Sequence, residues 1–346
     1  MNEEKQIVIM KDELKAEVVY LLKKVGVPEE DAEVTAEVMV ETNSKGIESH
    51  GVRWLDIYLK RIIAGGVSPV TKIDVVKDKG SLLILDANNG LGQVAATKAV
   101  EMGVKKAKEN GVSFVAIRNS NHFGATGYYT ELASKQNVIA FAATNSTPLM
   151  APWGGVDLCI GTNPLSYAFP TKDIPIVVDM ATTTLARGKV FIAARKGEPL
   201  QEGTALNKEG APTVDAKEAL EGVLLPVGGP KGFGLSLMID ILSGILTGSN
   251  YGAHITSLFG DVKTSQNIGH FAYFLNIEDF MDLDEYFEKI EDNKKIMKNS
   301  KLAQGFNKIF MPGEIEAGIS ERSLKEGISI PEPTMKVINE WKQKLL

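Results

Sequence analysis

Apolar residues in the N-terminal part of the chain recur at helical spacing. They return every three or four positions over 11–25, which predicts an amphipathic helix. Three acidic residues directly after Pro28 are typical of a helix start, because they face the positive end of the helix dipole. This second helix is expected to end near Ser44, and a third is predicted over 52–64, before two glycines. The first part of the chain is therefore predicted to be helical.

Beyond residue 70 the pattern alternates between short apolar runs and longer amphipathic segments. Such alternation indicates an α/β unit. The expected strands are 73–77, 82–86, 113–117 and 138–143, and the expected helices are 92–109 and 124–136.

The C-terminal half is less regular. Glycine and proline divide residues 146–175 into loops with short strands, and 248–270 is expected to be an irregular loop region. The remaining predicted elements are strand 175–179, helix 182–195, helix 230–247, strand 271–276, helix 278–292, strand 306–310 and helix 332–345.

Composition and charge narrow the class of protein. The chain has 346 residues, of which 44% are hydrophobic and 24% charged, as in ordinary soluble globular proteins. A net charge of −6 without a basic stripe argues against nucleic acid as a partner. The apolar run around 235–246 is interrupted by Asp240, which argues against a membrane span. With Cys159 as its one cysteine the chain forms no internal disulfide, and a cytoplasmic, soluble protein is expected.

Residues 90–95 imitate the dinucleotide-binding fingerprint G-x-G-x-x-A between a strand and a helix. Two features disagree with that motif. The strand and the first glycine are separated by several residues where the motif turns tightly, and the next strand ends in Arg118 and Asn119 rather than an acid. An arginine there could suit a 2′-phosphate, so the motif is not excluded. We interpret the segment as a glycine-rich loop that opens a helix.

The first candidate site segment is 48–53, which contains His50 and Arg53. A histidine beside a helix N-terminus has its neutral form favoured, which suits a general acid or base near pH 7. The neighbouring arginine could bind a carboxylate. A helix cap with a surface histidine explains the same residues equally well.

The second segment is 118–128, where a strand delivers Asn121, His122 and Tyr128 to the start of a helix. A helix N-terminus can bind an anion, and these side chains offer donors, acceptors and a proton carrier. We favour a functional site over a polar turn. A third segment, 228–235, places Lys231 among glycines before a helix, in a pattern that differs from the P-loop. No zinc-binding spacing is present, and no metal is expected.

Seven ordered motifs resemble the type 2 malate/L-lactate dehydrogenase family, the group that includes sulfolactate and ureidoglycolate dehydrogenases. Their order and spacing together are specific, and the resemblance covers nearly the whole chain. The motifs are Ser49-His50-Gly51, Asn121-His122-Phe123-Gly124, Ala151-Pro152-Trp153-Gly154-Gly155, Gly161-Thr162-Asn163-Pro164, Val178-Asp179-Met180-Ala181-Thr182, Gly229-Pro230-Lys231-Gly232-Phe233-Gly234 and Phe310-Met311-Pro312-Gly313-Glu314.

The resemblance implies a fold and an assembly. The fold would be an α/β, non-Rossmann nicotinamide-binding fold of the sulfolactate dehydrogenase type, with a mixed sheet and surrounding helices. Residues 1–70 would form a helical segment that packs with 306–346, and 71–305 would form the α/β domain that binds cofactor and substrate. Homodimers with active sites near the subunit interface would follow.

The resemblance also implies roles for individual residues. The catalytic positions are His122, which we favour as the acid/base, and His50, as second participant or substrate contact. The predicted substrate contacts are Ser49, Arg53, Asn121, Tyr128, Thr162 and Asn163. The predicted cofactor contacts are Ser146, Asp179, Met180, Ala181, Lys231, Pro312, Gly313 and Glu314. The family usually has an arginine where this chain has Trp54, and Arg53 lies one position earlier. On a helix that shift turns a side chain by about 100°.

These features predict reversible hydride transfer between a nicotinamide cofactor and C2 of a small 2-hydroxy or 2-oxo acid. Malate, or L-lactate, is the favoured substrate. Ureidoglycolate dehydrogenase, which 252–269 resembles, and sulfolactate dehydrogenase are the alternatives within enzymes. A non-catalytic nucleotide-binding protein on the same fold is the alternative from another class. NAD is the expected cofactor, with NADP as the alternative.

Overall fold

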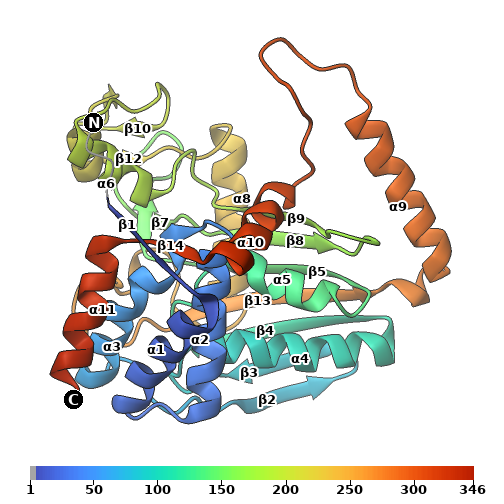
Figure 1. The fold of residues 1–346 in the computed structure, drawn as a ribbon, viewed down its shortest axis with the longest axis horizontal. Helices are drawn as coiled ribbons and strands as arrows, with labels where there is room; N and C mark the ends of the chain where they lie inside the picture. The colour runs from blue at the N-terminus through green and yellow to red at the C-terminus, as the bar shows by residue number, and fades with distance from the viewer. Residues whose placement is uncertain (1–4) are drawn as a thin grey trace.

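The computed structural model describes residues 5–346, which form three sheets with surrounding helices (Figure 1). The largest sheet has seven strands, of which only the pair β3–β4 is parallel. It is therefore a mixed sheet. In spatial order its strands are β2 (Asp74–Lys79), β3 (Leu82–Asp86), β4 (Val112–Ser120), β13 (Ile268–Asn276), β5 (Val138–Thr144), β8 (Leu165–Phe169) and β9 (Ile176–Met180).

Two helices, α4 (Gly92–Asn110) and α5 (Thr126–Ser134), pack against this sheet and build a core with it. Helix α4 is the crossover between the parallel strands β3 and β4. Its small residues allow close packing: a Cβ at Gly103 would lie 2.4 Å from the Phe274 ring of β13. The loop between β4 and α5 carries the second candidate segment.

A helical layer stands beside the sheet. It contains α1 (Lys11–Lys24), α2 (Glu29–Ser44), α3 (Leu55–Ala64) and α11 (Glu332–Lys344). Two 3-10 turns, Glu48–His50 and Val52–Trp54, connect α2 to α3. The first strand, β1 (Gln6–Ile9), pairs antiparallel with β14 (Ile328–Pro331), so distant parts of the chain share one core. The proposed division into two domains stays a prediction.

The second sheet has five short strands. Its strands, in order, are β11 (Pro212–Thr213), β10 (Ala205–Leu206), β12 (Val223–Leu224), β6 (Pro148–Met150) and β7 (Ile160–Gly161). It packs with α6 (Arg187–Lys196) and α7 (Ala216–Glu221) around a small core. Helix α8 (Pro230–Asp240) continues directly into a π-helical turn, Ile241–Ile245.

Helix α9 (Leu283–Lys298) and the loop that follows it stand away from the rest of the molecule (Figure 1). The chain returns through this loop to α10 (Glu314–Glu326). The predicted strand 306–310 is wrong: no strand forms there. Phe306 and Phe310 are 70% and 47% exposed, and a strand needs a neighbour to pair with.

Other differences concern boundaries and missed elements. The predicted helices at 182–195 and 278–292 begin later, at Arg187 and Leu283. Strands β1 and β14 and helix α10 were not predicted, because they are short or strongly charged and carry little periodic signal. No helix within residues 5–346 is both long and apolar enough to cross a membrane.

Candidate active site

A pocket of about 1880 Å³ lies between the helical layer, the β9 edge of the large sheet, α6 and α10. Ligand pockets typically measure about 300–1,000 Å³, so this one has room for a large ligand together with a small one. Eleven of the predicted site residues line it: Ser49, His50, Arg53, His122, Tyr128, Ser146, Thr162, Asp179, Met180, Ala181 and Gly313.

The turn that carries His50 is fixed from behind by Asn43 in α2. The side-chain oxygen of Asn43 accepts a hydrogen bond from the backbone N–H of Val52 at 2.7 Å. A Cβ at Gly51 would lie 1.9 Å from that oxygen, so the turn needs glycine there. The Ser49 hydroxyl lies 2.9 Å from Nδ1 of His50. The Ser-His-Gly motif therefore places His50 on the pocket wall.

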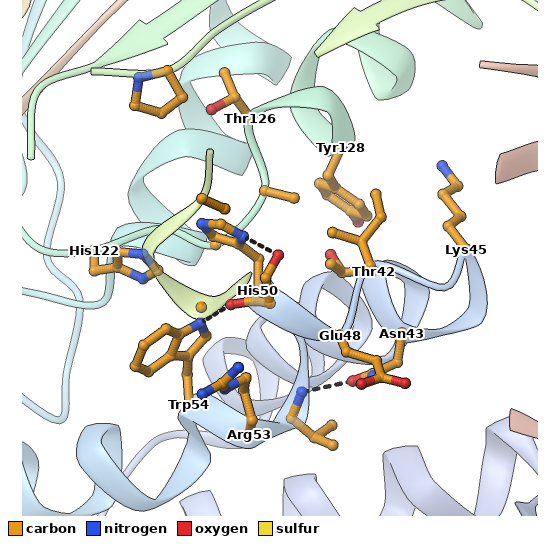
Figure 2. Close-up of a pocket in the computed structure, with 18 of the residues that line it drawn as sticks. Thr42, Asn43, Lys45, Glu48, His50, Arg53, Trp54, His122, Thr126 and Tyr128 are labelled. Carbon is orange, nitrogen blue, oxygen red and sulfur yellow. Dashed lines mark hydrogen bonds between the residues drawn. The ribbon is translucent and has the colours of Figure 1, made fainter. Parts of the chain in front are cut away.

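His122 reaches the same wall from the loop after β4. Its Nδ1 lies 2.6 Å from the hydroxyl of Tyr58 in α3. The imidazole rings of His50 and His122 are stacked, with centroids 5.8 Å apart and an interplanar angle of 13° (Figure 2). The fold thus brings together two histidines that are 72 positions apart in the sequence (122 − 50).

Both histidines are neutral at pH 7 in this environment. Burial, assisted by the charge of Arg53, lowers the pKa of His50 to about 4. Burial, followed by the charges of His50 and His270, lowers the pKa of His122 to about 3. Because both rings remain partly accessible through the pocket, a bound molecule can exchange a proton with either of them.

Trp54 and Phe259 form an aromatic wall beside the histidines. The indole N–H of Trp54 donates to the Ser49 carbonyl at 2.6 Å. Its ring lies 5.2 Å from that of Phe259 and 5.8 Å from that of His122, between centroids. The guanidinium of Arg53 lies over the indole at 5.2 Å and also borders the pocket (Figure 2). Trp54 thus occupies the position of the family's usual arginine, with a cation next to it.

Asp179, on β9, is one of the acidic residues that line the pocket. Its carboxylate accepts a hydrogen bond from the N–H of Gly127 at 2.9 Å, where a Cβ would come within 2.7 Å. Desolvation by the surrounding protein raises the pKa of Asp179 to about 6, against the hydrogen bond from Gly127 and the charge of Lys45, which lower it. The side chain is nevertheless exposed to solvent in the pocket. A bound ligand that removes this water would therefore strengthen its interactions with Asp179.

Five predicted site residues do not line the pocket: Asn121, Asn163, Lys231, Pro312 and Glu314. Asn163 supports the wall from behind, since it accepts from the Ser146 N–H at 3.0 Å and donates to the Ser236 carbonyl at 3.0 Å. The Pro312 carbonyl accepts from Val177 N–H at 3.0 Å, which holds Gly313 against β9. Direct ligand contacts of these five residues stay predictions.

The imitated dinucleotide motif does not reach the pocket either. A Cβ at Gly92 would lie 2.1 Å from the Asn121 carbonyl, so this glycine serves close packing of α4 beneath the His122 loop. Arg118 pairs with Asp86 at 2.9 Å. The interpretation as a glycine-rich loop that opens a helix agrees with this packing.

Several residues that surround the histidines were not predicted from the sequence. Tyr58 falls within the periodic apolar pattern of its helix, and Phe259 lies in an irregular loop, so neither gave a signal. His270 is buried, and its two ring nitrogens lie 2.8 Å from the hydroxyls of Thr144 and Ser120, which makes it a structural residue. Within residues 5–346 no three His, Cys, Asp or Glu side chains are grouped to hold a metal.

Comparison with known proteins gives a consistent result. The malate/L-lactate dehydrogenase family model matches residues 9–339. A malate dehydrogenase of Pyrococcus horikoshii is 40% identical, over 98% of this chain and 95% of its own length. The L-sulfolactate dehydrogenase of Methanocaldococcus jannaschii is 42% identical, over 90% of each chain. The ureidoglycolate dehydrogenase (NAD(+)) of Escherichia coli K12 is 34% identical, over 88% of this chain and 87% of its own length.

Solved structures agree. The sulfolactate dehydrogenase of Methanocaldococcus jannaschii superimposes with a TM-score of 0.93 at 39% identity, over 98% of this chain and 97% of that one. The malate dehydrogenase structure from Pyrococcus horikoshii gives a TM-score of 0.91, over 99% and 97%. The predicted mixed α/β fold of the sulfolactate dehydrogenase type is confirmed. The chain therefore belongs to the malate/L-lactate dehydrogenase family, whose members are oxidoreductases that act on hydroxy acids.

Proposed function

We propose that this protein transfers a hydride between NAD and C2 of a small 2-hydroxy acid, with malate as the first substrate and L-lactate as the second. The stacked pair of neutral histidines on the pocket wall is the observation that carries the proposal. Malate is favoured because the malate dehydrogenase of Pyrococcus horikoshii is similar over nearly the whole chain. Sulfolactate and ureidoglycolate are the alternative substrates, and the family match favours an enzyme over a non-catalytic nucleotide-binding protein.

The pocket fits a nicotinamide dinucleotide. Its volume exceeds what a small acid needs, and residues with hydroxyl and carboxylate side chains line it in addition to the aromatic wall. The residues that would hold the dinucleotide are Ser146, Asp179, Met180, Ala181 and Gly313, with Lys231, Pro312 and Glu314 in support. When bound, the nicotinamide supplies or accepts the hydride. NAD is the first choice, and NADP is the alternative.

The residues of this chain would transfer the proton and bind the oxygens of the substrate. Nδ1 of His122 is engaged with Tyr58, which leaves Nε2 for the substrate oxygen. In reduction Nε2 gives its proton to the developing alkoxide, and in oxidation it takes the proton back. His50 lies beside it as second participant or substrate contact. Ser49, Arg53, Tyr128 and Thr162 are the proposed polar contacts, with Asn121 and Asn163 behind them.

The test is an absorbance assay at 340 nm with both reduced cofactors and a panel of 2-oxo acids. We expect oxaloacetate or pyruvate to be reduced with NADH. The His122→Ala variant should turn over at least about a hundredfold more slowly while binding the cofactor as before. No activity with any 2-oxo acid, or a near-normal rate of the variant, would contradict the proposal.

We also propose a cytoplasmic homodimer. A lone cysteine requires no oxidising compartment. Helix α8 and its π-turn expose several large apolar side chains, and groups of such side chains on soluble proteins are usually covered by a partner. The exposed residues are Leu235, Leu237, Met238, Ile241, Ile245 and Leu246. A Leu246→Asp variant should halve the mass measured by sedimentation, whereas Val75→Asp, on exposed β2, should not. A monomeric wild-type protein would refute the dimer.

A further inference from the structure

The ring nitrogen of His122 that faces the protein interior is bound by a tyrosine. Tyr58 lies on α3, is only 4% exposed, and places its hydroxyl 2.6 Å from Nδ1 of His122. A hydroxyl can donate to Nδ1 or accept from Nδ1–H, and the two cases leave opposite tautomers at Nε2. What the Tyr58 proton does therefore decides which form of His122 meets the substrate.

Behind this pair lies a small cavity of about 10 Å³, bordered by Tyr58, Arg61, Asn121, His122 and Gln266 among others. That is close to the space one water molecule needs. Two fully enclosed polar atoms in its lining have no protein partner: Oδ1 of Asn121, an acceptor, and Nε of Arg61, a donor. Buried polar groups are rarely left without partners, and a water in this cavity would satisfy both.

A second polar side chain lies near the same hydroxyl. The Gln93 side chain in α4 is fully buried, and it lowers the pKa of Tyr58 against the larger effect of burial, which is the effect of a nearby donor on a phenolic oxygen. Neither of its polar atoms has a partner within hydrogen-bond distance. Gln93 therefore leaves the phenolic proton to the other side of the hydroxyl, where the unpartnered Oδ1 of Asn121 borders the small cavity.

We propose that Tyr58 is the positioning residue of His122: its proton points to a resident water in the small cavity, and its oxygen accepts a hydrogen bond from Nδ1–H of His122. Neutral His122 then presents an unprotonated Nε2 to the pocket, as a base for the alcohol. The same Nδ1–H···O bond persists when Nε2 is protonated, so only one nitrogen changes state during turnover. This inference rests on the proposed role of His122.

The contact between Tyr58 and His122 also opposes the effects that disfavour protonation of His122. Burial and two neighbouring imidazoles disfavour a positive charge on His122 and hold its pKa low. A phenolic oxygen that accepts from Nδ1–H stabilises the imidazolium, because a hydrogen bond to a charged donor is stronger than one to a neutral donor. Loss of the Tyr58 hydroxyl should therefore lower the pKa of His122 further and allow both neutral tautomers of His122 to be populated.

The experiment is ¹⁵N NMR of the imidazole nitrogens of the wild-type protein and of Tyr58→Phe, at neutral pH. Four histidines keep the spectrum simple, and a His122→Gln variant assigns the signals. We expect a protonated Nδ1 and an unprotonated Nε2 in the wild type, and a mixture or the reverse in Tyr58→Phe. Turnover of the 2-hydroxy acid in Tyr58→Phe should fall about tenfold or more, with the KM for the cofactor unchanged.

The control is Tyr273→Phe, which removes another phenol hydroxyl, one that lies 2.5 Å from the Tyr167 hydroxyl on the large sheet. Tyr273 borders neither the large pocket nor the small cavity behind His122. The control variant should leave both the His122 signals and turnover unchanged. A wild-type His122 protonated at Nε2 would overturn the inference even if Tyr58→Phe does not fold, and so would a Tyr58→Phe protein with wild-type turnover. Because the NMR signals do not depend on turnover, failure of the proposed function is distinguished from failure of this inference.

Discussion

The imidazole rings of His50 and His122 lie almost parallel, with 5.8 Å between their centroids. At this distance two positive charges repel each other strongly in a water-poor site. The pair therefore accepts one proton far more readily than two, and the charge of one ring lowers the pKa of the other. Reversible hydride transfer requires one proton to pass to and from the substrate oxygen, and a histidine pair that holds a single proton can supply it.

The low pKa of His122 predicts an unusual pH profile. As a base in oxidation it must be neutral, so kcat/KM for the hydroxy acid should stay level as the pH falls to about 5 and decline only below that. Reduction needs the protonated form, so its kcat/KM should rise as the pH falls through the same range. Initial rates in both directions across pH test this. An acid limb near pH 6.5 in the oxidation profile would place an ordinary histidine at the reaction centre.

The two histidines should differ in the size of their effects. His122→Ala removes the proposed proton carrier and should reduce kcat by at least about a hundredfold. His50→Ala removes a neighbour and should raise the KM for the 2-oxo acid more than it lowers kcat. Steady-state kinetics of both variants, with cofactor affinity measured separately, rank the two. The reverse order of effects on kcat would assign the proton to His50.

Arg53 is expected to take over the carboxylate contact that the family's arginine makes one position later. Arg53 borders the pocket beside Trp54, although it lies one position before the family's arginine in the sequence. Arg53→Ala should raise the KM for the 2-oxo acid about tenfold with kcat largely kept, since it removes one charged hydrogen bond. Arg53→Lys should restore less than half of the loss, because lysine lacks the planar fork. Unchanged KM values would exclude Arg53 from the carboxylate site.

Gly92 tests whether the imitated fingerprint binds a phosphate. Because a Cβ there would collide with the Asn121 carbonyl, Gly92→Ala should destabilise the protein by about 1–3 kcal/mol. The folded fraction should still bind the cofactor with wild-type affinity. Gly318→Ala is the matched control: its Cβ meets nothing within 4 Å inside α10, so it should stabilise by up to about 1 kcal/mol. Thermal melts measure the loss of stability and a cofactor titration measures the affinity. A large loss of cofactor affinity in Gly92→Ala would indicate that the fingerprint-like segment binds a phosphate.

The sequence predicted most of the regular elements, because their apolar residues follow the helical or strand period closely. It also predicted that His122 lies between a strand and a helix, as it does, and that His50 lies close to the start of a helix, where the structure has a 3-10 turn before α3. It could not predict that Tyr58 would meet His122, since that contact depends on how α3 packs against the loop after β4. Nor could it separate Asn163, which supports the wall, from Thr162, which lines it, because adjacent residues differ only in side-chain direction.

The pairing of β1 with β14 has a consequence for how the molecule matures in the cell. Ile7 pairs with Ile330, and Trp341 packs in the same core as Leu14 and also borders the pocket. A growing chain on the ribosome can complete the β3–α4–β4 unit early, but its first helices must wait for residues 328–341 before they are covered. The wall of the pocket would then be closed last. A ribosome-bound chain stalled before residue 328 should leave its N-terminal helices open to proteases and chaperones.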